Sequence, residues 1–206
     1  MSVQTKPFIT PEEYLERERA AEFKSEYYNG EIFPLGEPPG ADPVDMAGAR
    51  RNHVLLVSSV VTALNNALQD RTCLVFPTDM RVHVEAYGLY TYPDVAVVCG
   101  EEQYLDTQKD TLVNPVLLVE VLSASTERYD RGQKFEFYRS ITSLQEYVLV
   151  AQDRRSVEVF RKNDEGHWVL YEADTEQGTI ELASVGATLK LDDLYANVTF
   201  DTTSAA

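Results

Sequence analysis

The sequence predicts a single α/β domain in which two main helices flank a mixed sheet and the C-terminal part is rich in strands. Three observations point to this class. Two nearly continuous apolar runs, 93–98 and 116–122, are typical of central strands that are covered on both faces. Apolar residues recur at helical spacing over 52–69. A chain of 206 residues with ordinary globular composition is long enough to bury one core.

The N-terminal segment predicts a helix followed by a hairpin. The helix spans about 10–21, because Thr10 is followed by a proline and then by a glutamate that completes a capping box. Residues 24–35 form a hairpin, since Asn29-Gly30 is a strong signal for a two-residue turn. The proline and glycine content of 36–48 predicts a loop there.

The rest of the chain predicts mainly strands. The helix over 52–69 is the longest, and a second long helix begins at Ser125 or Thr126 and ends near Ile141. Further strands are expected at 72–76, 79–85, 146–150, 156–161, 168–172 and 179–182, and a last helical turn at 191–195. We therefore expect one domain over 1–206, with a core at about 8–165 and a β extension over 166–200.

Several classes of protein are excluded or disfavoured by composition. No apolar run approaches the roughly 20 residues of a membrane helix. The N-terminus lacks the basic and apolar segments of a signal peptide, so we expect a cytoplasmic protein with no membrane association. Cys73 and Cys99 are too few for a disulfide framework and show no zinc-binding spacing, which predicts two buried, reduced thiols.

The net charge of -16 argues against a nucleic-acid partner, because phosphate binding depends on a basic surface. The charge is unevenly distributed, however. Residues 128–162 are the one net-basic segment, with eight basic and five acidic side chains. This segment is either a solvated helix and turn or a local surface that faces an anion.

Two carboxylates on the predicted central strands are the strongest candidates for chemistry. Strand side chains alternate, so Leu118, Glu120 and Leu122 share one face. A buried Glu120 requires a metal ion, a cationic partner or access to a cleft. Asp94 begins the other apolar run directly after a proline, which fits a turn or a strand that starts at a cleft. Together the pair favours Mg²⁺, which one or two carboxylates can hold.

Three further side chains are candidates beside this pair. Lys134 lies on the apolar stripe of its helix, four residues before Tyr138, so its ammonium either points toward Glu120 or extends to the surface. Glu26 precedes the hairpin turn by three residues, where it either approaches a metal or faces solvent. His53 near the start of the long helix is either a packed or capping histidine or a contact for substrate phosphate.

The chemistry-bearing motifs form an ordered set. They are 26–32 with its hairpin glutamate, Tyr92-Pro93-Asp94-Val95, Val119-Glu120-Val121-Leu122-Ser123, 129–135 with Asp-Arg-Gly-Gln-Lys, and 143–149. This set resembles the signature of the putative restriction endonuclease family, over about residues 8–165. The resemblance implies the PD-(D/E)XK nuclease-like fold, a restriction-endonuclease-like mixed central sheet flanked by helices. It also implies catalytic roles for four residues, which are Glu26, Asp94, Glu120 and Lys134.

One position departs from the wider nuclease pattern. That pattern places a lysine two residues after the strand glutamate, on the same face, and here this position is Leu122. A leucine can neither donate nor accept a proton. Lys134 matches the place on the following helix from which the family takes its lysine, so the resemblance assigns the role to Lys134.

The leading hypothesis is a Mg²⁺-dependent endonuclease that hydrolyses DNA phosphodiester bonds. Asp94 and Glu120 would bind Mg²⁺, or Mn²⁺ in its place, with the carbonyl of Val121 as a further ligand. Lys134 would stabilise charge on the phosphate or help to deprotonate a water. Two side chains are weaker candidates for contacts with substrate phosphate, namely His53 and Arg131.

Two other classes are also considered. A catalytically inactive nuclease-fold module, acting in binding or as a structural protein, is favoured by the net charge and by Leu122. A glycosidase with paired carboxylates ranks last, because Trp168 is the single tryptophan available for sugar stacking. The expected partners are weakly bound DNA, a second copy in a homodimer with two cleavage sites, and a protein that supplements DNA binding.

Overall fold

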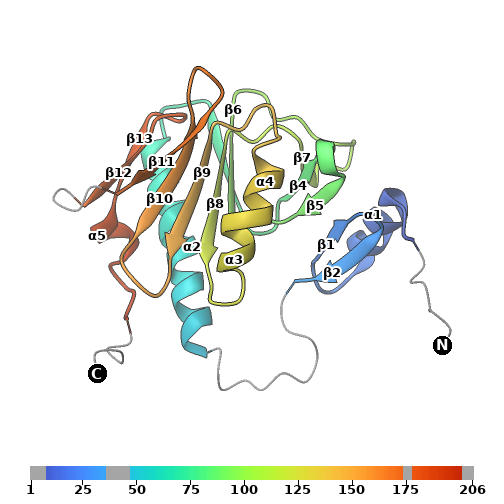
Figure 1. Ribbon diagram of the computed structural model, residues 1–206, viewed down its shortest axis with the longest axis horizontal. Coiled ribbons are helices and arrows are strands. Elements are labelled where there is room, and N and C mark those ends of the chain that lie inside the picture. Colours follow the sequence, from blue (N-terminus) through green and yellow to red (C-terminus); the bar gives the residue numbers. More distant parts are fainter. Residues whose placement is uncertain (1–7, 36–46, 174–177, 201–206) are drawn as a thin grey trace.

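The computed structural model describes residues 8–35, 47–173 and 178–200, and its centre is a six-stranded sheet (Figure 1). The strand order is β11-β10-β9-β8-β6-β3. The strands are β3 (Cys73–Pro77), β6 (Val95–Cys99), β8 (Leu117–Leu122), β9 (Glu146–Ala151), β10 (Val157–Lys162) and β11 (Trp168–Glu172). β8 and β9 run parallel, and the other neighbours pair antiparallel. The two apolar runs of the sequence are thus adjacent central strands, as predicted.

Helices cover the two faces of this sheet. α2 (Ala47–Ala67) lies behind the sheet in Figure 1, and α3 (Glu127–Tyr129) and α4 (Phe135–Tyr138) lie in front of it. Alternate residues of each strand contribute side chains to two hydrophobic cores, one on each face of the sheet. Val95 and Val97 pack with the α2 side, whereas Ala96 and Val98 pack with the α4 side. Burial on both faces explains why these strands are apolar throughout rather than alternating.

A five-stranded sheet of order β2-β1-β5-β4-β7 flanks the centre. Its strands are β1 (Ser25–Tyr28), β2 (Glu31–Pro34), β4 (Arg81–Val84), β5 (Leu89–Thr91) and β7 (Thr111–Leu112), and a 3-10 turn, η1 (Glu85–Tyr87), precedes β5. The β1–β2 turn is Asn29-Gly30, and both residues have positive φ, as the predicted two-residue turn requires. α1 (Pro11–Ala20) begins with the predicted capping box and packs its Tyr14 on Tyr27 and Tyr90.

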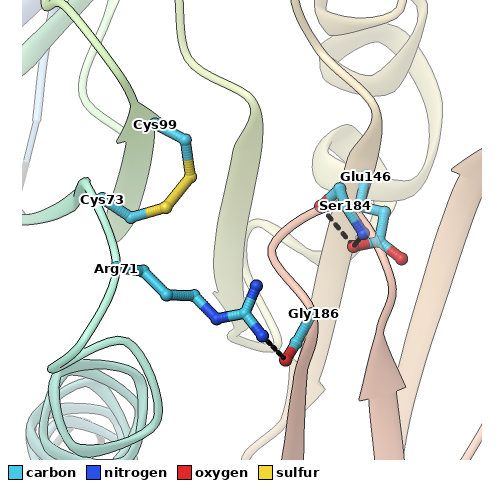
Figure 2. Close-up of a disulfide and its surroundings, with 6 residues drawn as sticks. All are labelled: Arg71, Cys73, Cys99, Glu146, Ser184 and Gly186. Carbon is cyan, nitrogen blue, oxygen red and sulfur yellow. Dashed lines mark hydrogen bonds between the residues drawn. A yellow bond between two sulfur atoms is a disulfide. The ribbon is translucent and has the colours of Figure 1, made fainter.

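The C-terminal part is a small hairpin on the α2 side. It comprises β12 (Thr179–Leu182), β13 (Ala187–Lys190) and the helical turn α5 (Leu191–Leu194). Glu146 of β9 is fully buried and anchors the hairpin, because its carboxylate accepts bonds from the backbone of Ala183 and Ser184 and pairs with Arg161 at 2.6 Å. Figure 2 shows Ser184 reaching this carboxylate.

The prediction of two reduced thiols is wrong. Cys73 of β3 and Cys99 of β6 are joined by a disulfide, which Figure 2 shows beside the Arg71 guanidinium and its bond to the Gly186 carbonyl. The cause is the strand register, which places Cys73 directly opposite Cys99 with 4.0 Å between their Cα atoms. Two cysteines are too few for a framework but sufficient for one cross-strand bridge.

The other differences from the predicted elements are small. α2 begins at Ala47 rather than 52, and 36–46 of the predicted loop lies outside the described residues. The helix predicted from about 126 to Ile141 is instead three short segments, with a π-helical turn, η2 (Asp130–Lys134), between α3 and α4. β5, β7 and β13 were not predicted, because two to four residues carry too little pattern. No helix in the described ranges is long and apolar enough to cross a bilayer.

Candidate active site

The two central carboxylates face each other across adjacent strands. β6 and β8 pair with Val95 opposite Val119, and the same register places Asp94 opposite Glu120. Both residues line one pocket of about 400 Å³ at the end of the strands. The antiparallel register therefore brings together the two residues that the sequence singled out.

Asp94 is held in place through both of its oxygens. Oδ2 accepts a hydrogen bond from the backbone N–H of Val121 at 2.8 Å, and Oδ1 lies 3.1 Å from Nε2 of His53. Burial alone would lower the pKa of His53, but the bond to Asp94, its charge and the Val121 backbone outweigh burial and raise this pKa. The contact with Asp94 therefore stabilises the charged form of the His53 ring, and Nε2 is positioned to donate to Asp94 Oδ1.

Glu120 is buried in contact with two side chains of the covering helix. Its residue exposure is 4%, and Oε1 accepts a bond from the Tyr138 hydroxyl at 2.9 Å and lies 2.8 Å from Lys134 Nζ. Burial raises the pKa of Glu120 to about 8, Lys134 opposes the shift, and Asp130 and Asp94 add to it. Glu120 is thus a carboxyl group whose charged form depends on a nearby cation.

Lys134 supplies one such cation. Its Nζ lies 2.8 Å from Glu120, 3.6 Å from Asp130 Oδ1 and 3.8 Å from Glu26 Oε1. Burial by itself would lower the pKa of Lys134, but the charges of these carboxylates outweigh burial and raise it well above its ordinary value. Lys134 therefore stays an ammonium at neutral pH and acts as a fixed positive charge.

The π-helical turn lies at this site. Asp130 and Lys134 are its two end residues, and both are buried, as is Tyr138 one turn further along. The three side chains form one stripe that faces Glu120, which confirms the predicted placement of Lys134 on the apolar stripe. π-helical turns are rare and occur frequently at functional sites.

Glu26 reaches the same cluster from the β1–β2 hairpin. It is buried, and its Oε1 accepts a short hydrogen bond from the Thr91 hydroxyl of β5. The pairing of Tyr27 with Tyr90 brings these two strands together. Glu26 thus belongs to the Lys134 cluster and does not face solvent.

Arg131 lies apart from the pocket. Its guanidinium pairs with Glu127 at 2.8 Å and with both oxygens of Glu158, at 2.5 and 2.9 Å. These contacts fasten the helical segment to β10. Arg131 is not among the residues that line the pocket, whereas His53 is.

Several pocket residues were missed in the sequence. Among the described residues, the further lining side chains are Lys24, Leu35, Thr78, Tyr92, Ser123, Thr126 and Asp130. Lys24 donates to the Thr78 carbonyl and to Asp79, each at 2.9 Å, at the rim. Nothing in the local pattern around Lys24 signals this position, which depends on the hairpin meeting the loop before β4.

The donor set fits a hard divalent cation. Asp94, Glu120 and the Val121 carbonyl are oxygen donors at one pocket, and Mg²⁺ is held by one or two carboxylates together with water and phosphate oxygens. In the part of the chain that the structure describes, no group of three or more acidic, histidine or cysteine side chains is arranged so that it could hold a metal ion.

The chain matches a family model and two related proteins over most of its length. A family model described as Uma2, putative restriction endonuclease, matches residues 11–192. An uncharacterized protein of Synechocystis sp., sll1609, is 38% identical over 183 residues, which cover 89% of this chain and 97% of that protein. A second one, slr1290, is 34% identical over 196 residues, covering 94% and 95%.

A solved structure shares the fold. The crystal structure of a putative nuclease belonging to DUF820 from Anabaena variabilis matches with a TM-score of 0.69 and 20% identity. The match covers 91% of this chain and 98% of that chain. It confirms the predicted mixed α and β architecture of a nuclease-like protein.

Proposed function

We propose that this chain, which belongs to the Uma2 family of putative restriction endonucleases, is a metal-dependent endonuclease that hydrolyses DNA phosphodiester bonds. One observation carries the proposal. Two carboxylates from adjacent central strands and a buried ammonium from the covering helix line a single pocket. This is the donor set that a reaction at a phosphate needs, with anionic metal ligands and one fixed positive charge.

Asp94, Glu120 and the Val121 carbonyl would hold the metal, which is Mg²⁺ or Mn²⁺. When bound, the ion supplies Lewis-acid activation of water and neutralises charge on the phosphate. Val121 contributes twice, because its N–H also fixes the orientation of Asp94. Tyr138 fixes Glu120 in the same way from the helix.

Lys134 stabilises negative charge that develops on the phosphate. The charges of Glu120, Glu26 and Asp130 raise the pKa of Lys134 and favour its ammonium form, which suits this role. Glu26 and Asp130 balance its charge and hold it beside Glu120. Glu26 would in addition hold a second metal or an outer-shell water.

A catalytically inactive module with the same fold is the second candidate. Leu122, at the position of the usual strand lysine, is 3% exposed and packed in the core on the α4 side. The strand itself therefore carries no catalytic cation. Under this alternative the Lys134 cluster is a structural ion network, and the protein binds DNA or a partner without cleaving.

Cleavage assays with site variants test the proposal. Wild-type protein is expected to cleave labelled DNA with Mg²⁺ or Mn²⁺ and not in EDTA, while Asp94→Asn and Glu120→Gln fall to background. Asp164→Asn, an exposed aspartate in the β10–β11 turn, is the matched control and should cleave like wild type. Thermal unfolding verifies that each variant folds. Equal cleavage by wild type and both site variants would refute the assignment.

A further inference from the structure

One face of the β1–β2 hairpin forms a wall of the candidate site. Lys24 and Leu35 line the pocket, and Glu26 approaches Lys134. The hairpin pairs Glu26 with Phe33, and the backbone bond between Lys24 and Leu35 continues this register. Directly opposed residues of an antiparallel pair project to the same side, so Glu26 and Phe33 share one hairpin face with Lys24 and Leu35, the two members of this face that line the pocket.

Phe33 is the unusual member of this wall. Its exposure is 45%, although the residue opposite it is buried in the site. The other face of the hairpin packs Tyr27 and Ile32 against α1, so the hairpin is anchored without the Phe33 ring. An exposed aromatic ring next to a phosphate-handling site suits a flat apolar partner, and each nucleobase presents such a face.

The rim of the pocket favours a single, flexible nucleic-acid strand over a duplex. The catalytic groups are recessed, with Glu120 and Lys134 at 4% and 6% exposure, and the pocket holds about 400 Å³. Lys24 lies at the rim, where its ammonium is paired at 2.9 Å with the exposed carboxylate of Asp79. A chain of net charge -16 has little basic surface with which to follow the two backbones of a duplex.

We infer that the substrate is an unpaired DNA strand, and that Phe33 stacks on a base beside the scissile phosphate while Lys24 contacts the backbone. This inference rests on the proposed nuclease function and specifies its substrate class. The hairpin then has two roles, because β1 carries Glu26 into the Lys134 cluster and β2 presents the Phe33 ring for stacking.

Binding measured in EDTA tests the stacking role separately from cleavage. Fluorescence anisotropy with a labelled single strand and with its duplex is expected to show tighter binding of the single strand. Phe33→Ala should weaken single-strand binding about tenfold, and Phe33→Trp should retain it. Tyr171→Ala is the matched control, since Tyr171 is 43% exposed on the edge strand β11 and should leave binding unchanged.

Cleavage by wild-type protein with Mg²⁺ completes the test. The single strand should be cut faster than the duplex, and Phe33→Ala should lose this preference. Faster cutting of the duplex, or equal binding by Phe33→Ala and Tyr171→Ala, would overturn the inference while leaving the nuclease function intact. Absence of any cleavage, together with tight single-strand binding that needs Phe33, would instead refute the nuclease function alone.

Discussion

Glu120 and Lys134 show how far single residues reveal a site before the structure is known. A buried glutamate inside an apolar strand run needs a partner, and a lysine on an apolar helical stripe either points inward or extends to the surface. In the structure the two side chains meet, with 2.8 Å between Lys134 Nζ and Glu120 Oε1. The apolar stripe predicts only that the Tyr138 ring packs, whereas its hydroxyl also donates to Glu120, because a tyrosine has an apolar ring and a polar tip.

His53 is the residue whose role the structure changes most. The sequence left open a packed or capping histidine or a contact for substrate phosphate, and the structure places the ring 3.1 Å from Asp94 Oδ1 at the pocket. Removal of a side chain that orients a metal ligand typically lowers metal affinity or activity by about 10- to 100-fold.

His53→Ala is therefore expected to weaken the affinity for Mg²⁺ rather than the affinity for DNA. Asp94 loses one of its two fixing bonds, so the Mg²⁺ concentration that gives half-maximal cleavage should rise by about tenfold or more. A titration of cleavage rate against Mg²⁺ measures this, and single-strand binding in EDTA is the control. Weakened DNA binding with an unchanged Mg²⁺ requirement would return His53 to a phosphate contact.

The elements around the site depend on pairings that the sequence does not display. The predicted hairpin and central strands are confirmed because each carries a local pattern, such as Asn29-Gly30 or an apolar run. The contact of Glu26 with Thr91 depends on β5, a strand of three residues without such a pattern. The π-helical turn was missed for a related reason, since the apolar spacing of a helix hardly changes when one turn widens.

The disulfide between β3 and β6 is expected to stabilise the fold. It closes a separation of 26 residues, for which the chain-entropy model gives about 3.5 kcal/mol. Cys73→Ser should lower the free energy of unfolding by about this amount in denaturant titrations under oxidising conditions. Reductant should lower the stability of wild type similarly and leave Cys73→Ser unchanged. Equal stability of wild type with and without reductant would contradict the bridge.

The contact of α1 with the β4–β7 edge predicts that the free energy of unfolding depends on pH. Arg19 pairs with Asp110 at 2.7 Å, and this bond chiefly, with help from Arg81, lowers the pKa of Asp110 to about 2. A depressed carboxyl pKa stabilises the fold above the ordinary value near 3.8, and this stabilisation is lost as the pH falls toward 2.

Asp110→Asn should accordingly reduce the free energy of unfolding at pH 7 by about 1 kcal/mol, since the pair is partly exposed. The difference from wild type should shrink between pH 4 and pH 2. Urea titrations at a series of pH values measure it, with Asp164→Asn as the control. A difference that stays constant down to pH 2 would contradict the ion-pair explanation.

At the scale of the whole molecule, the structure explains why a basic segment gives little basic surface. Several arginines of 128–162 pair with acidic residues outside the segment, including Arg131 with Glu127 at 2.8 Å and Arg155 with Asp192 at 2.6 Å. The segment is net basic in the sequence, but these partners offset part of its charge, and only the fold brings Asp192 of α5 near Arg155. This supports weak intrinsic affinity for DNA and a site that relies on local contacts.

The central claim is that Asp94 and Glu120 form one metal site, and calorimetric titration of the metal-free protein with Mn²⁺ and Mg²⁺ tests it most directly. Saturable binding is expected for wild type and for Asp164→Asn, and this binding should be lost in Asp94→Asn and in Glu120→Gln. The contrary result is no binding by wild type, or binding that both site variants retain. Either outcome would leave the protein as an inactive module with a nuclease fold.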